Sequence, residues 1–114
     1  MEIEQIEEII MGIIVNAGEA KALAYEGLRG ARRGEFMQAA ELIEQARMAL
    51  NGAHAVQTDV IRREVEGVDK VPVSIMFVHA QDHLMTVISD IQLIEEMIEM
   101  QKEIFELKQR IKVV

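Results

Sequence analysis

Apolar residues recur at every third or fourth position through most of this sequence, and the pattern is broken only twice. This spacing is typical of amphipathic helices, and it covers residues 3–33, about 35–63 and about 72–112. The first two segments are separated by a residue or two, so we expect them to fold back on each other as an antiparallel hairpin. The sequence therefore predicts an all-α fold, an antiparallel three-helix bundle, with residues 1–114 forming a single domain.

Glycines and the single proline mark the expected ends of these helices. Gly34 follows two arginines, as expected at the C-terminal end of a helix, where glycine adopts the left-handed conformation and cations favour the helix dipole. Residues 64–70 are charged and contain Gly67, so we expect a linker there. Pro72 follows, and proline is favoured in the first turn of a helix.

The three stripes define the candidate core. In the first helix the stripe is Ile3, Ile6, Ile10, Ile13, Ala17, Ala20, Ala24, Gly27 and Ala31. In the second helix it is Phe36, Ala39, Ile43, Ala46, Leu50, Ala53, Gln57 and Val60. In the third helix it is Phe77, Ala80, Leu84, Val87, Ile91, Ile94, Ile98 and Phe105. The small residues of the first stripe predict that another helix packs closely against it.

Composition excludes several classes of protein. The chain has no cysteine, so disulfides and thiolate metal sites are absent. Its formal net charge of −8 argues against a nucleic-acid partner, because phosphate contacts need a basic surface. The N-terminus is acidic where a signal peptide is basic, and the apolar run at residues 9–15 is too short to cross a bilayer. We therefore expect a cytoplasmic protein without direct membrane insertion.

The third helix carries a second apolar stripe, offset from the first by roughly 100°. Its members are Leu93, Met97, Met100, Ile104, Leu107 and Ile111. A monomeric three-helix bundle buries one such face per helix, so the second face predicts a partner, and self-association is the commonest source of one.

Toward the N-terminus the same face becomes polar. His79, Asp82 and His83 lie three and four positions apart, which places them together on one side of a helix. Thr86 and Asp90 continue the polar part. Polar groups at an interface are costly unless they are satisfied, so this cluster predicts a chemical site more than a packing feature.

Two kinds of chemistry fit this cluster. Histidines at i and i+4 can chelate zinc, and His-x-x-Asp-His is similar to the inverted zinc-peptidase motif His-x-x-Glu-His. That motif needs a further acidic ligand well downstream, and only 31 residues follow His83. The alternative is a nucleophilic histidine, since neutral imidazole has one lone-pair nitrogen that can accept a phosphoryl group. The chain has no glycine loop for a nucleotide phosphate.

Several stretches resemble the enzyme IIA components of the lactose/cellobiose branch of the bacterial phosphoenolpyruvate-dependent sugar phosphotransferase system. Residues 78–85, VHAQDHLM, resemble the active-site stretch of that family. Residues 11–18, MGIIVNAG, residues 34–36, GEF, and residues 53–58, AHAVQT, resemble its first helix, its first turn and its second helix. The resemblance covers nearly the whole chain.

The resemblance implies a fold, partners and roles for the cluster. The three helices would trimerise into a homotrimeric nine-helix bundle. His79 would accept phosphoryl from the histidine-containing phosphocarrier protein and pass it to a cysteine of the IIB component, which phosphorylates the sugar imported through the membrane IIC component. His83 and Gln81 would flank the phosphorylated ring. Asp82 would lie near the threefold axis, where three copies share one Mg²⁺ ion per trimer.

The resemblance also bears on the sugar. Ala80 and residues 47–51 are more similar to the cellobiose and diacetylchitobiose members than to the lactose members. Two alternatives remain beside the phosphocarrier: a non-catalytic helical-bundle adaptor, in which the cluster is a structural polar layer, and a protein with a His/Asp metal site.

Overall fold

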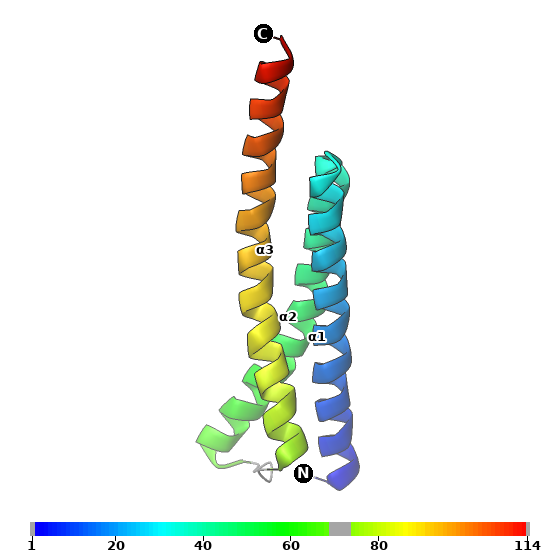
Figure 1. Cartoon of the computed structure of the whole chain (residues 1–114). Coiled ribbons are helices and arrows are strands. Elements are labelled where there is room, and N and C mark those ends of the chain that lie inside the picture. Colours follow the sequence, from blue (N-terminus) through cyan, green and yellow to red (C-terminus); the bar gives the residue numbers. More distant parts are fainter. Residues whose placement is uncertain (1, 69–73, 114) are drawn as a thin grey trace.

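The chain folds into three long helices. The computed structural model describes residues 2–68 and 74–113, with α1 at Ile3–Arg32, α2 at Phe36–Glu66 and α3 at Ile75–Val113. Figure 1 shows α1 and α2 as an antiparallel hairpin, with α3 running alongside and extending past the turn of that hairpin. The predicted all-α three-helix bundle is confirmed. Within the described ranges, no helix is long and apolar enough to cross a membrane.

The hairpin turn has the left-handed glycine conformation that the sequence predicted at Gly34. Gly34 has a φ of +83°, which an L side chain rarely adopts. The chain then turns back, with the Glu35 amide donating to the Gly30 carbonyl at 2.9 Å and the Gly34 amide donating to the Ala31 carbonyl at 3.0 Å. These hydrogen bonds satisfy the carbonyls left open at the end of α1.

Small residues set the spacing between α1 and α2. A side chain at Gly27 would lie 3.3 Å from the Ala39 carbonyl oxygen and 3.4 Å from Leu42 and Ile43. Only glycine therefore lets the two backbones come this close. The fully buried alanines on the facing stripes are Ala17, Ala20, Ala24, Ala39, Ala46 and Ala53. The predicted close approach of a second helix is confirmed.

Side-chain contacts join α3 to the hairpin along its length. Phe36 and Phe105 pack edge to face with ring centroids 5.6 Å apart. In the middle, Arg47 of α2 pairs with Glu95 of α3 at 2.6 Å, and this hydrogen bond and charge attraction raise the pKa of the Arg47 guanidinium. The pairing adds an ion pair at the surface of the contact between α2 and α3.

The structure differs from the sequence prediction at several positions. The second helix does not end near residue 63; it continues to Glu66, and Gly67 caps it with a φ of +74°. Ile3 is 75% exposed, because it is the first residue of α1 and lies at the end of the bundle. Phe105 is 41% exposed although its ring meets Phe36. Pro72 lies outside the described residues. The first described residues of the third segment are Ser74 and the start of α3, where the Phe77 amide donates to the Ser74 hydroxyl at 3.1 Å.

Candidate functional site

His79 and His83 occupy successive turns of α3, and their rings lie face to face. The ring centroids are 6.3 Å apart and the ring planes differ by 5°. His79 is exposed, whereas His83 is half-buried. The pair thus offers one accessible imidazole, with a second, parallel imidazole that the bundle partly encloses on the next turn of α3.

A glycine of α1 lies next to His83. The Cβ of any side chain at Gly18 would lie 3.9 Å from His83 Nε2, with nothing else within 4 Å. His83 is therefore seated against α1 at a position without a side chain. One and two turns before Gly18 on the same face of α1, Val15 and Met11 are exposed. Exposed apolar side chains thus continue from Gly18 toward the start of α1.

Asp82 lies on the outer side of α3. Its side chain is exposed, and within residues 2–68 and 74–113 it has no ion pair or hydrogen bond to another side chain. No group of three His, Asp or Glu side chains in the described part of one chain is placed to hold a metal ion. The zinc-site alternative, which needs such a group within the chain, gains no support. Asp82 contributes a single carboxylate. A metal ion bound at Asp82 would therefore need further carboxylates from other copies of the chain.

Gln81 lies on a different side of α3 from the histidines. Two positions along a helix correspond to about 200°, so Gln81 and His79 point to nearly opposite sides. Gln81 is half-buried and faces α2, where Gln57 Nε2 donates a hydrogen bond to Gln81 Oε1. The structure therefore brings His79, Asp82 and His83 together, and it places Gln81 apart from them within one chain.

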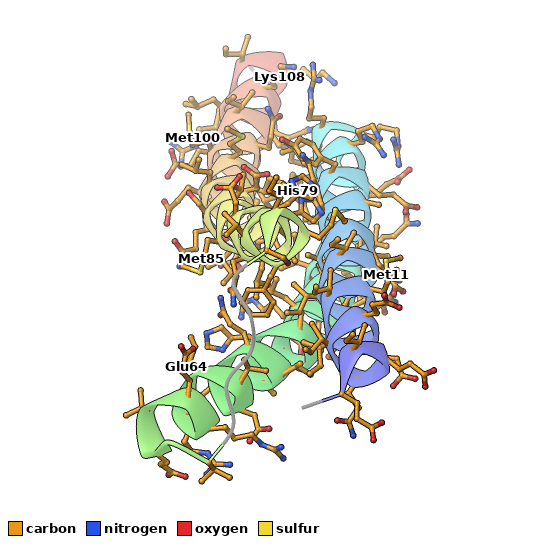
Figure 2. The ribbon with its side chains drawn as sticks, turned by 90° about the horizontal axis from the view of Figure 1, so that it is seen from below. Met11, Glu64, His79, Met85, Met100 and Lys108 are labelled. Carbon is orange, nitrogen blue, oxygen red and sulfur yellow. The ribbon has the colours of Figure 1, made fainter. Side chains whose placement is uncertain are left out.

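The second stripe of α3 is exposed along its length, as expected for a face that a single chain leaves uncovered. Met100 is 58% exposed and Leu107 55%. Figure 2 looks along α3 and shows Met100 on the side of the helix away from α1. At the polar end of this face, Asp90 forms an ion pair with Lys21 of α1 at 3.9 Å. The cluster and the apolar stripe thus occupy one continuous face of one helix.

Sequence reasoning missed two contributors to this region. Gln57 was assigned to the core stripe of its helix by spacing alone, and nothing local indicated that it would meet Gln81. Gly18 is not part of the predicted stripe of the first helix, and nothing local indicated that the His83 ring would lie next to it. A groove of about 540 Å³ between α1 and α2, lined in part by Gly12 and Asn16, contains none of the predicted site residues.

Comparison with known proteins accounts for nearly the whole chain. Residues 8–102 match the family described as "PTS system, Lactose/Cellobiose specific IIA subunit". The chain is 47% identical over 103 residues to the N,N'-diacetylchitobiose-specific EIIA component of Escherichia coli K12, covering 90% of this chain and 88% of the relative. It is 34% identical over 103 residues to the lichenan-specific IIA component of Bacillus subtilis, covering 90% and 93%.

Solved structures give the same result. The crystal structure of the cellobiose-specific enzyme IIA from Bacillus anthracis superposes with a TM-score of 0.85 at 36% identity, covering 93% of this chain and 94% of that one. The IIA(Chitobiose)–HPr complex of the Escherichia coli phosphotransferase system superposes with a TM-score of 0.73 at 44% identity, covering 87% and 95%. The chain therefore belongs to the lactose/cellobiose-specific IIA family of the sugar phosphotransferase system, as its motifs predicted.

Proposed function

We propose that this IIA subunit carries a phosphoryl group on His79 as a phosphohistidine. The observation that carries the proposal is an exposed imidazole whose orientation is supported by a parallel, half-buried neighbour, His83. A neutral imidazole has one lone-pair nitrogen, and its attack forms a phosphorus–nitrogen bond while the bond to the donor breaks. Such a transfer depends on positioning more than on additional reactive groups.

The proposed donor is the histidine-containing phosphocarrier protein, HPr, and the proposed acceptor is a cysteine of the IIB component. The Escherichia coli relative forms a complex with HPr, which supports this donor. Exposed apolar side chains at Met11 and Val15, on the face of α1 that Gly18 turns toward His83, offer contact area for a protein beside the histidines. The IIB component would pass the group to the sugar that the membrane IIC component imports.

We further propose that three copies associate through the exposed stripe of α3 into a nine-helix bundle. Burial of apolar surface stabilises association by about 25 cal/mol per Å². Several large side chains per copy, from Leu93 to Ile111, are available for it. A closed threefold arrangement would cover this stripe in every copy.

In that trimer, Asp82 of three copies would hold one Mg²⁺ ion. Asp82 is exposed on the face that would turn inward, and carboxylate oxygens with retained waters are the ligands that Mg²⁺ prefers. The ion would supply positive charge that offsets three carboxylates, and it takes no part in the transfer steps proposed here.

The type of sugar that the system imports is proposed from the specificities of related IIA components. A disaccharide of the N,N'-diacetylchitobiose or cellobiose type is favoured by the Escherichia coli relative and by a Lactococcus lactis cellobiose-specific EIIA component that is 42% identical over 81 residues. The proposed donor and the absence of cysteine both fit a cytoplasmic location.

The test is a transfer assay. With phosphoenolpyruvate, enzyme I and HPr, the protein should gain one acid-labile, base-stable phosphate, and His79→Ala should abolish it while helical content measured by circular dichroism is unchanged. Normal labelling of His79→Ala would overturn the assignment of His79. Absence of labelling in the unaltered protein would favour the adaptor instead.

A further inference from the structure

The positive charges of this acidic protein are concentrated at one end of the molecule. Figure 1 shows that the turn between α1 and α2 lies at the same end as the last turns of α3. We call residues 29–37 and 102–112 the basic end. It holds seven of the twelve lysines and arginines of the chain but three of its twenty aspartates and glutamates. The cations are Arg29, Arg32, Arg33, Lys102, Lys108, Arg110 and Lys112.

Most cations of the basic end have no acidic partner. Arg33 pairs with Glu35 at 3.1 Å, and Lys102 pairs with Glu99 at 3.0 Å. The other five cations are exposed, and within residues 2–68 and 74–113 they form no ion pair. The basic end therefore presents uncompensated positive charge to its surroundings, although the chain as a whole carries a formal net charge of −8.

The preference of helix ends for certain charges does not account for this surface. Cations interact favourably with the C-terminal end of a helix, and α1 and α3 both end here. α2 ends elsewhere in the molecule, and there Arg62 is neutralised by Asp59 at 2.7 Å and by Glu66 at 3.2 Å. α2 begins at the basic end, where its dipole favours acidic residues, yet its first turn has none. The uncompensated charge thus belongs to a surface that two segments build together.

The side chains of the basic end are complementary to an anionic lipid surface. Clusters of about four to eight lysines and arginines on an amphipathic helix are typical of segments that bind anionic headgroups. Met37, in the first turn of α2, is 85% exposed and places an apolar side chain among the cations. Cations around an exposed apolar side chain fit the boundary between headgroups and acyl chains better than a purely acidic protein surface.

The negative charge of the rest of the chain does not oppose such a contact. The molecule is 66 Å long, and the acidic start of α1 lies at the opposite end from the α1–α2 turn. At physiological ionic strength exposed charges are screened over about 8 Å, so a surface that touches the basic end interacts mainly with its cations. In the proposed trimer, three basic ends would lie on the same side and reinforce one another.

We propose that the basic end docks reversibly on an anionic membrane surface. Its lysines and arginines contact headgroup phosphates, and the contact requires no segment that crosses the bilayer. His79 precedes Lys108 by 29 positions, which corresponds to about 45 Å of helix, so the histidine pair stays clear of the membrane. The inference goes beyond the proposed phosphoryl transfer and does not depend on it.

Sedimentation with vesicles tests the proposal. Vesicles of phosphatidylglycerol and phosphatidylcholine in equal amounts should carry the protein down at low salt, whereas vesicles of phosphatidylcholine alone should not. Binding should weaken as salt is added, because screening reduces each contact. If the anionic vesicles bind no protein at low salt, or if both kinds of vesicle bind equally, the proposal is overturned.

Two double substitutions that change the net charge equally test where the docking surface lies. Arg32→Gln with Lys112→Gln removes two cations of the basic end, and the partition coefficient onto anionic vesicles should fall at least about thirtyfold. Arg62→Gln with Arg63→Gln removes two cations near the end of α2 and should bind as the unaltered protein does. Circular dichroism checks that both variants keep their helical content. Equal losses of binding would show that net charge alone matters and would overturn the proposal.

An acidic polypeptide is the alternative occupant of the basic end. Polyglutamate titrated into ¹⁵N-labelled protein probes this alternative through the amide shifts of residues 29–33 and 108–112. We expect weak, salt-sensitive shifts with polyglutamate and vesicle binding as described above. Shifts confined to these residues in a protein that binds no anionic vesicles would assign the surface to an acidic polypeptide and overturn membrane docking.

Discussion

The rings of His79 and His83 lie parallel on successive turns of α3, with their centroids 6.3 Å apart. We expect His83→Ala to retain some phosphoryl acceptance, because in the proposed transfer His83 supports the His79 ring and does not form the bond. His83→Phe keeps a flat ring in the same place and should label faster than His83→Ala. The measurement is the initial rate of phosphate incorporation from HPr. Equal rates for the two variants would show that ring support is unimportant.

Ile104 lies in the exposed stripe of α3 and is 40% exposed in the single chain. We expect Ile104→Glu to dissociate the proposed trimer, because burying a carboxylate between apolar faces is strongly unfavourable. Sedimentation equilibrium at micromolar concentration should give three times the chain mass for the unaltered protein and one times for the variant. Gln92→Glu, exposed on another side of the same helix, is the matched control and should remain assembled.

Three copies of Asp82 close to one axis would repel one another when no cation is present. Removing the charge should relieve this repulsion, so Asp82→Asn is expected to raise the melting temperature in chelator at pH 8 and to reduce the stabilisation by Mg²⁺. Thermal unfolding with chelator and with added Mg²⁺ measures both effects. The axial-metal proposal is wrong if chelator leaves the unaltered protein unaffected and Asp82→Asn melts lower under both conditions.

The last turns of α2 carry ion pairs that depend on pH. The hydrogen bond from Arg62, helped by the charges of Arg63 and Arg62, lowers the pKa of the Asp59 carboxyl. A carboxyl whose pKa is lower in the folded state stabilises that state above its ordinary pKa, and the contribution disappears as the pH falls through the folded value. Amide hydrogen exchange at residues 59–66, corrected for the intrinsic rate, should therefore accelerate on acidification below about pH 4. Asp59→Asn should lose this acid-dependent step.

Gly34 and Gly67 offer a matched pair of substitutions. Both have a positive φ, but a Cβ at Gly34 would lie 3.3 Å from the Phe105 ring, whereas a Cβ at Gly67 would meet nothing within 4 Å. Each alanine should cost about 1 kcal/mol for the backbone conformation, and Gly34→Ala should cost roughly 1 kcal/mol more for displacing Phe105. Urea unfolding of both variants measures the difference, and equal losses would show that the ring moves freely.

Local sequence patterns predicted the helices because each depends on spacing within one segment. The predicted end of α2 was wrong for a local reason as well. Glu64 and Glu66 are charged, which suggested a linker, yet Glu66 pairs with Arg62 one turn earlier and extends the helix. Gly67, assigned to the linker, instead provides the left-handed cap.

The candidate site was predicted only in part. His79, Asp82 and His83 share a face at any helical geometry, so their proximity could be read from the sequence. The contact between Gln57 and Gln81 could not, because it depends on where α2 crosses α3. That crossing is set by packing of all three helices, and the two residues are 24 positions apart.

The histidine pair lies in the same uninterrupted helix as the part of α3 that extends past the hairpin turn (Figure 1). A helix transmits its rotational register along its whole length, since every residue is fixed relative to the next. Whatever covers Leu107 and Ile111 therefore also determines the direction in which His79 and Asp82 face, several turns away. In the proposed trimer, association at one end of the molecule and alignment of the histidines at the other are thus a single geometric event.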